Sequence, residues 1–241
     1  MLHCGIYLFS CKSRLRKKEI MKICSVSIFV IGAIACVANA GFVNPLIPAW
    51  RGTADTEYMG WENFSSAYGG SNLPDAPNSN NLGALINFGP GAVLTSTKNI
   101  YGTSGPLFIS MLGGMTAAPR NPLEVVLNIS AAGTVINMQS VMLSLMDNNG
   151  SMLRLSPEQS LIRSDESFPM GGRVQTLAFT WKFSPNMIPA TRWQIDFSST
   201  GANTSLDAVS LDMRFIPAPG ALSVLAMLGG GGMICGRRRR L

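Results

Sequence analysis

The chain has 241 residues, of which 13% are charged, and a formal net charge of +6. The positive charge lies at the two ends, because residues 41–216 contain nine basic and twelve acidic residues. This balance gives the central segment no basic face, so we expect no nucleic-acid partner.

All five cysteines and the single histidine also lie outside residues 41–216. The central segment therefore cannot form a Cys/His zinc site, a cysteine nucleophile or a Ser-His-Asp triad. We expect no metal and no cofactor there. Because it has no internal disulfide, its core must be held by burial alone.

A secretory signal peptide is predicted at residues 21–40. Lys22 precedes an apolar run that starts at Ile23, and Ala38-Asn39-Ala40 matches a small-x-small cleavage site before Gly41. A buried core helix and an N-terminal membrane anchor are the alternatives. Residues 1–20 are interpreted as a mis-called start or an extended basic n-region.

The exported domain is predicted to span residues 41–216 and to begin with a loop-rich part. Trp50, Tyr58, Trp61 and Phe64 lie among proline and small polar residues. Residues 65–81 are rich in Gly, Ser, Asn and Pro, which predicts a long surface loop, with an interdomain linker as the alternative.

Short strand-like runs separated by turn residues follow from residue 82. Apolar residues alternate in 173–183 and 191–199, which is the pattern of strands with one buried face. The spacing favours an all-β fold, an antiparallel β-sandwich or jelly roll. Ser156–Leu161 is a candidate short helix, because Ser-Pro-Glu-Gln suits a helix N-terminus. The predicted strands lie within 81–88, 92–97, 106–112, 123–130, 134–146, 173–183, 191–199 and 205–215.

The last of these strands, in "IDFSSTGANTSLDAVSLDMRF", resemble the closing strands of carbohydrate-binding-module-like jelly rolls. In such modules a segment like "SLDAVSL" forms a late strand that carries an aspartate. The resemblance implies a sandwich fold and a polysaccharide ligand.

Three groups of residues in this domain are candidates for chemistry. Glu57 and Glu62 flank aromatic residues, as in a sugar-binding or sugar-cleaving site; the alternative is a strand whose aromatics fill the core. Residues 147–151, "DNNGS", have the composition of a calcium loop but the spacing of a hairpin turn. Trp50 and Trp61 are candidate sugar-stacking residues, whereas Trp181 and Trp193 fit core positions in alternating strands.

A C-terminal transmembrane helix is predicted within residues 217–241. The run from Ala221 to Cys235 is apolar or small, and about twenty residues are available to span the bilayer. Four arginines then act as a stop-transfer signal: Arg237, Arg238, Arg239 and Arg240. A helix packed on a soluble core is the alternative.

This tail resembles the PEP-CTERM sorting signal of Gram-negative bacteria, in its planctomycete-like Pro-Ala-Pro-Gly variant. The motif is Pro217, Ala218, Pro219 and Gly220, in which alanine stands where the family motif has glutamate. The resemblance implies insertion in the inner membrane, processing by an exosortase and association with extracellular polysaccharide.

Together these features predict an exported, surface-sorted protein of the cell envelope or exopolysaccharide matrix. Its expected role is structural or adhesive, without catalytic activity. A carbohydrate-binding, lectin-like module is the first alternative, and a carboxylate-based glycoside hydrolase is the second.

Overall fold

The computed structural model describes residues 41–77, 83–114, 120–167, 172–185 and 189–216. These residues form two antiparallel β-sheets, and all their named elements are strands, which confirms the predicted all-β class. In this part of the chain, no helix has the length and apolar character needed to cross a membrane. The predicted signal peptide and the sorting tail lie outside the described residues.

Sheet A has the strand order β10-β11-β7-β13-β1-β2, and β5 joins it by pairing with both β13 and β4. Strand β13 is therefore an interior strand between β7 and β1, although it comes last in the sequence. The bounds are β1 (Thr56–Trp61), β2 (Ala76–Pro77), β4 (Ala92–Leu94), β5 (Ile100–Gly102), β7 (Pro122–Gly133), β10 (Gln159–Ser167), β11 (Arg173–Lys182) and β13 (Thr204–Phe215).

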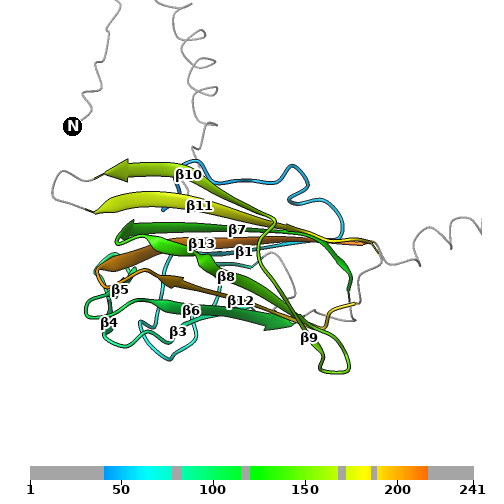
Figure 1. Cartoon of the computed structure of the whole chain (residues 1–241), viewed down its shortest axis with the longest axis horizontal. Coiled ribbons are helices and arrows are strands. Elements are labelled where there is room, and N and C mark those ends of the chain that lie inside the picture. Colours follow the sequence, from blue (N-terminus) through cyan, green and yellow to red (C-terminus); the bar gives the residue numbers. More distant parts are fainter. Residues whose placement is uncertain (1–40, 78–82, 115–119, 168–171, 186–188, 217–241) are drawn as a thin grey trace, which may run out of the picture. The chain divides into compact units, whose positions relative to one another are not determined.

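Sheet B has the order β3-β6-β12-β8-β9. In Figure 1, strands β12, β6 and β3 lie in a layer below β10, β11, β7 and β13 of sheet A. The bounds in this sheet are β3 (Ala84–Asn87), β6 (Phe108–Gly114), β8 (Ile136–Met146), β9 (Met152–Leu155) and β12 (Arg192–Ser199).

The core lies between the two sheets and consists of the inward-facing residues of both. Trp193, Ile195 and Phe197 of β12 alternate with polar residues and are almost completely buried. Trp181 of β11 belongs to the same cluster, so the predicted core positions of Trp181 and Trp193 are confirmed. Burying such side chains is the main stabilising contribution in a domain without disulfides.

The sequence predicted most strands but not all of them. Ser156–Leu161 is not helical: Ser156 and Pro157 have no regular structure, and Gln159 starts β10. Residues 147–151 form a tight hairpin between β8 and β9, in which Asp147 Oδ1 accepts hydrogen bonds from the backbone N–H groups of Asn149 and Ser151 at 2.8 Å. The prediction of a hairpin turn at these residues is therefore confirmed.

The described part of the predicted loop, residues 65–77, is organised around one buried side chain, Asn72, and ends in the short strand β2, which the prediction did not include. Its Oδ1 accepts hydrogen bonds from the backbone N–H groups of Ser65 and Ser66, at 2.7 and 2.8 Å. Its Nδ2 donates to the carbonyls of Ser66 and Leu85, at 3.0 and 3.1 Å. Asn72 thereby ties the loop to sheet B.

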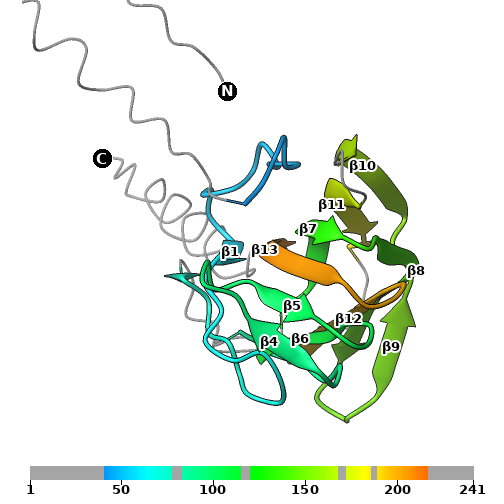
Figure 2. The same ribbon diagram turned by 90° about the vertical axis from the view of Figure 1, so that its left-hand side faces the viewer.

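Residues 41–53, called here the N-terminal strap, lie against the outer face of sheet A. Figures 1 and 2 show this blue segment on the side of sheet A away from sheet B. The backbone N–H of Leu46 donates to Asn128 Oδ1 at 2.8 Å, and Asn128 Nδ2 donates back to the Leu46 carbonyl at 3.1 Å. The strap explains why polar residues on this face, such as Asn128 and Asp212, are completely buried.

Candidate functional site

The outer face of sheet B, unlike that of sheet A, is not covered by the strap. Strand register places its outward side chains in continuous rows across the sheet. One row joins Ile86, Ser110, Asp196 and Met142, and the next joins Ala84, Leu112, Gln194, Ser144 and Arg154. This surface is called the open face, and its residues are Ala84, Ile86, Phe88, Phe108, Ser110, Leu112, Gly114, Met142, Ser144, Met146, Met152, Arg154, Arg192, Gln194, Asp196 and Ser198.

A carboxylate and an amide lie together at the centre of the open face. Gln194 Nε2 donates to Asp196 Oδ1 and Oδ2, at 2.8 and 3.0 Å. Both side chains are partly exposed, and both belong to β12, the middle strand of sheet B. This pair offers hydrogen-bond acceptors and a fixed amide to a ligand lying across the strands.

Exposed apolar side chains flank this polar centre. Phe88 and Phe108 are 54% and 47% exposed, and they lie side by side, because the Phe88 N–H donates to the Phe108 carbonyl at 2.8 Å. Leu112 and Met152 are also exposed, at 40% and 54%. Apolar side chains clustered on one face of a sheet are typical of a binding surface.

The structure places the two predicted ligand-binding tryptophans away from this face. Trp61 is fully buried and its Nε1–H donates to the Asn72 carbonyl at 3.0 Å, so its predicted role in sugar stacking is wrong. It fills the core, as the alternative proposed. Trp50 lies in the strap, where its Nε1–H donates to Glu124 Oε2 at 2.9 Å and the Arg214 guanidinium is 5.8 Å from its ring.

Glu57 and Glu62 are not brought together as an acid/base pair. Glu57 is buried and ion-paired with Arg120 at 2.7 Å. Burial raises the pKa of Glu57, and the charge of Arg120 opposes this shift. Glu62 lies near Asp75, and partial burial, helped by that carboxylate, raises the pKa of Glu62. Glu57 is thus paired with an arginine, whereas the carboxyl group near Glu62 is that of a second acid, Asp75.

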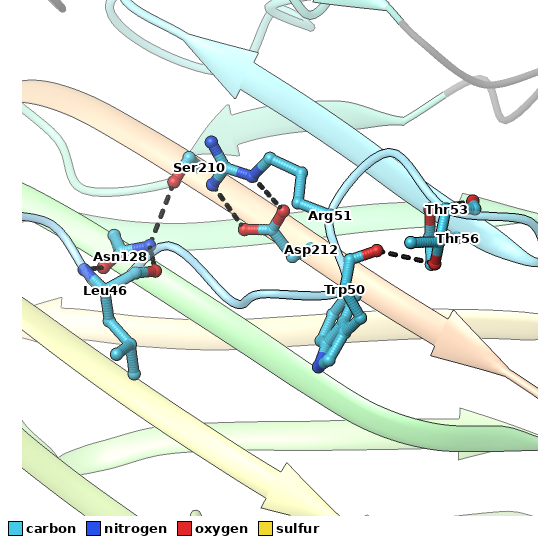
Figure 3. Close-up of polar contacts among 8 residues, drawn as sticks. All are labelled: Leu46, Trp50, Arg51, Thr53, Thr56, Asn128, Ser210 and Asp212. Atoms are coloured by element: carbon cyan, nitrogen blue, oxygen red, sulfur yellow. Dashed lines mark hydrogen bonds and ion pairs between the residues drawn. The ribbon is translucent and has the colours of Figure 1, made fainter.

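The other buried carboxylate of sheet A, Asp212, is held by the strap. Arg51 donates two hydrogen bonds to it, at 2.5 and 2.7 Å (Figure 3). The Arg51 guanidinium also lies 4.1 Å from the centre of the Tyr58 ring. Burial raises the pKa of Asp212, and the hydrogen bonds and charge of Arg51 oppose the rise. These hydrogen bonds attach the strap to sheet A.

The described residues contain no group of three or more His, Cys, Asp or Glu side chains that could hold a metal ion. The open face offers hydrogen-bonding side chains and exposed apolar side chains.

The open face was not predicted from the sequence, although the alternating pattern of one of its strands is visible there. The alternation in 191–199 shows that Gln194 and Asp196 point away from the core. Only the pairing of β12 with β6 and β8 shows what lies beside them, because those strands are distant in the chain.

Comparison with known proteins finds no protein family that matches the chain and no match among curated proteins. Among solved structures, a mutant of a family 29 carbohydrate-binding module in complex with cellulohexaose shows 12% identity and a TM-score of 0.24, covering 66% of this chain and 89% of that one. A second mutant of a family 29 module shows 12% identity and a TM-score of 0.25, covering 66% and 92%. At these scores, neither likeness bears on the ligand of this chain.

Proposed function

We propose that this protein is an exported, non-catalytic adhesive component of the cell envelope that binds polysaccharide through the open face. The observation that supports this most is the combination of exposed Phe88 and Phe108 with the central Gln194–Asp196 pair. A sugar chain presents flat apolar C–H faces and a rim of hydroxyl groups, which match apolar side chains and hydrogen-bonding side chains respectively.

The test is binding of the full-length protein to a panel of soluble polysaccharides, measured by affinity electrophoresis and calorimetry. We expect Phe108→Ala to weaken binding at least tenfold, which corresponds to about 1.4 kcal/mol. Because Phe108 is half exposed, this variant should keep its fold.

Ile162→Ala is the matched control, because Ile162 is 55% exposed but lies on β10 in sheet A. It should bind as the parent protein does. Failure to bind any polysaccharide, or equal binding by the Phe108→Ala and parent proteins, would show the proposal to be wrong.

We further propose that the sequence outside the described residues directs the protein to the envelope. The signal peptide would be removed before Gly41, and the tail from Pro217 would insert in the inner membrane. The resemblance to PEP-CTERM signals supports exosortase as the partner that processes this tail.

Intact-mass measurement of the protein recovered from its envelope fraction tests this sorting. We expect an N-terminus at Gly41 and loss of Arg237–Arg240. Retention of the arginines would indicate a simple membrane anchor in place of processing, and retention of residues 21–40 would contradict signal cleavage.

A further inference from the structure

Gly41, the first residue of the strap, lies directly against strand β13. A Cβ built at this residue would lie 2.8 Å from the Cβ of Ala208 and 3.6 Å from the carbonyl oxygen of Asp207. The φ angle of Gly41 is +109°, which favours glycine over every other residue. A side chain at position 41 would therefore displace either the strap or β13.

From Gly41 the strap crosses sheet A in the direction of β11. The backbone N–H of Val43 already donates to Oγ1 of Thr176, on β11, at 3.1 Å. Strand β7 lies between β13 and β11, whereas β5 pairs with the other edge of β13. The strap therefore leaves β13 on the side away from β5, and the backbone nitrogen of Gly41 is at the β13 end of this crossing.

The carboxylate of Asp207 lies on the same outer face of β13. Its Oδ1 accepts hydrogen bonds from Asn99 Nδ2, just before β5, at 2.6 Å and from Ser205 Oγ at 2.8 Å. Leu206 faces the core, so its neighbour Ser205 faces outward together with the carboxylate that it contacts. A β-bulge between Leu206 and Ala208 allows Asp207 and Ala208 to share this face.

This partly buried carboxylate has no cation beside it and uses only one of its oxygens. Asp207 forms no ion pair with any described residue, and its two side-chain hydrogen bonds both end on Oδ1. Burial raises the pKa of Asp207, and the hydrogen bonds from Ser205 and Asn99 oppose the rise. A positive charge within about 4–6 Å would favour the ionised form of such a group.

We propose that Asp207 binds the α-ammonium group of Gly41 that signal cleavage creates, and thereby fixes the start of the strap on sheet A. The inference rests on the cleavage before Gly41 in the proposed function. Hydrolysis of the Ala40–Gly41 bond consumes one water molecule and leaves a carboxylate on Ala40 and an ammonium group on Gly41. The uncharged amide of the precursor thus becomes a charged donor that Asp207 Oδ2 can accept.

The test measures the pKa of the Gly41 α-amino group in the mature protein recovered from its envelope fraction. Trace labelling with acetic anhydride over a range of pH gives this pKa, because only the neutral amine reacts. The tryptic peptide 41–51, which ends at Arg51, carries the label. We expect a pKa about one unit above the ordinary α-amino range of about 7.7–8.0, whereas burial alone would lower it.

Two matched substitutions test the partner. Asp207→Asn keeps an oxygen acceptor for Asn99 and Ser205 but removes the charge, so the α-amino pKa should return to its ordinary range. Glu166→Gln removes the same charge from an exposed position on β10 of the same sheet, where Glu166 forms no ion pair with a described residue. This control should leave the α-amino pKa raised.

A third variant moves the charge instead of the carboxylate. Insertion of Ser-Gln between Ala40 and Gly41 keeps the cleavage site and places the new ammonium group two residues before Gly41. Its pKa should be ordinary, and hydrogen exchange of the Val43 amide should be several-fold faster than in the parent protein. Asp207→Asn should accelerate this exchange to a similar extent, and the combination should be no faster than either change alone.

The outcomes separate this inference from the proposed function. An ordinary or lowered α-amino pKa in the parent protein, or a raised pKa that persists in Asp207→Asn, overturns the inference while cleavage before Gly41 stands. A mature N-terminus at another residue contradicts both the cleavage and the inference. Polysaccharide binding through the open face is measured separately, and none of these results changes its outcome.

Discussion

Replacing Arg51 by alanine is expected to cost about 3–5 kcal/mol of unfolding free energy, because it leaves Asp212 buried without its partner. The Asp212 side chain is 0% exposed, and both its oxygens accept hydrogen bonds from Arg51. For a domain of this size the loss corresponds to a melting temperature lower by roughly 6–20 °C. Urea unfolding followed by tryptophan fluorescence measures it.

Arg173 provides a matched control for this variant. Its bonds to Asp165 have nearly the same lengths, 2.7 and 2.5 Å, but the two side chains are 50% and 19% exposed. Arg173→Ala should therefore cost at most about 1 kcal/mol, as exposed ion pairs do. Similar losses for the two variants would contradict the assigned role of burial.

The pH dependence of the Arg51→Ala variant gives a second check. Burial raises the pKa of Asp212 above its ordinary value, and loss of Arg51 removes the opposing effect. For a carboxyl with a raised folded-state pKa, stability is lost as the pH rises through that pKa. The deficit of the variant should therefore shrink as the pH is lowered, and Arg51→Ala combined with Asp212→Asn should recover much of it at neutral pH.

Asn72→Ala is expected to cost about 2–4 kcal/mol, because it leaves several buried backbone groups without partners. The amide contacts two N–H groups and two carbonyls, and Asn72 is only 1% exposed. Asn72→Asp should be destabilised as well at neutral pH, because a carboxylate oxygen would then face the carbonyls of Ser66 and Leu85. Both losses can be measured by urea unfolding.

Asn63→Ala is the control, at a position two residues before this loop. Asn63 is exposed, so its substitution should change the unfolding free energy by less than about 0.5 kcal/mol. A comparable loss in this variant would mean that the loop responds to any substitution. The role of Asn72 as its organising residue would then be wrong.

The strands that could be predicted from the sequence are those with one buried face. In 191–199 the alternation of Trp193, Ile195 and Phe197 with polar residues requires one side to face a core. Strand β10 has no such pattern, because it is an edge strand that is mostly exposed. The Ser-Pro-Glu-Gln run, whose glutamine is the first residue of β10, suits a helix start, and tertiary pairing with β11 overrides that local preference.

The candidate site could be predicted only in part, for a different reason. Residues such as Gln194 and Ser144 become neighbours through strand register, which depends on pairing between segments about fifty residues apart. Trp61 was a reasonable candidate because a tryptophan near glutamates suits sugar binding. Its position on the inward side of β1 depends on the sheet as a whole.

The place of β13 in sheet A has a consequence for the order in which the domain can fold. This strand lies between β7 and β1 and supplies Asp212, the partner of Arg51 in the strap. Sheet A therefore cannot be completed until residues close to position 215 have been synthesised. The strap is synthesised much earlier, but Arg51 cannot pair with Asp212 before then. Such dependence on distant contacts slows folding.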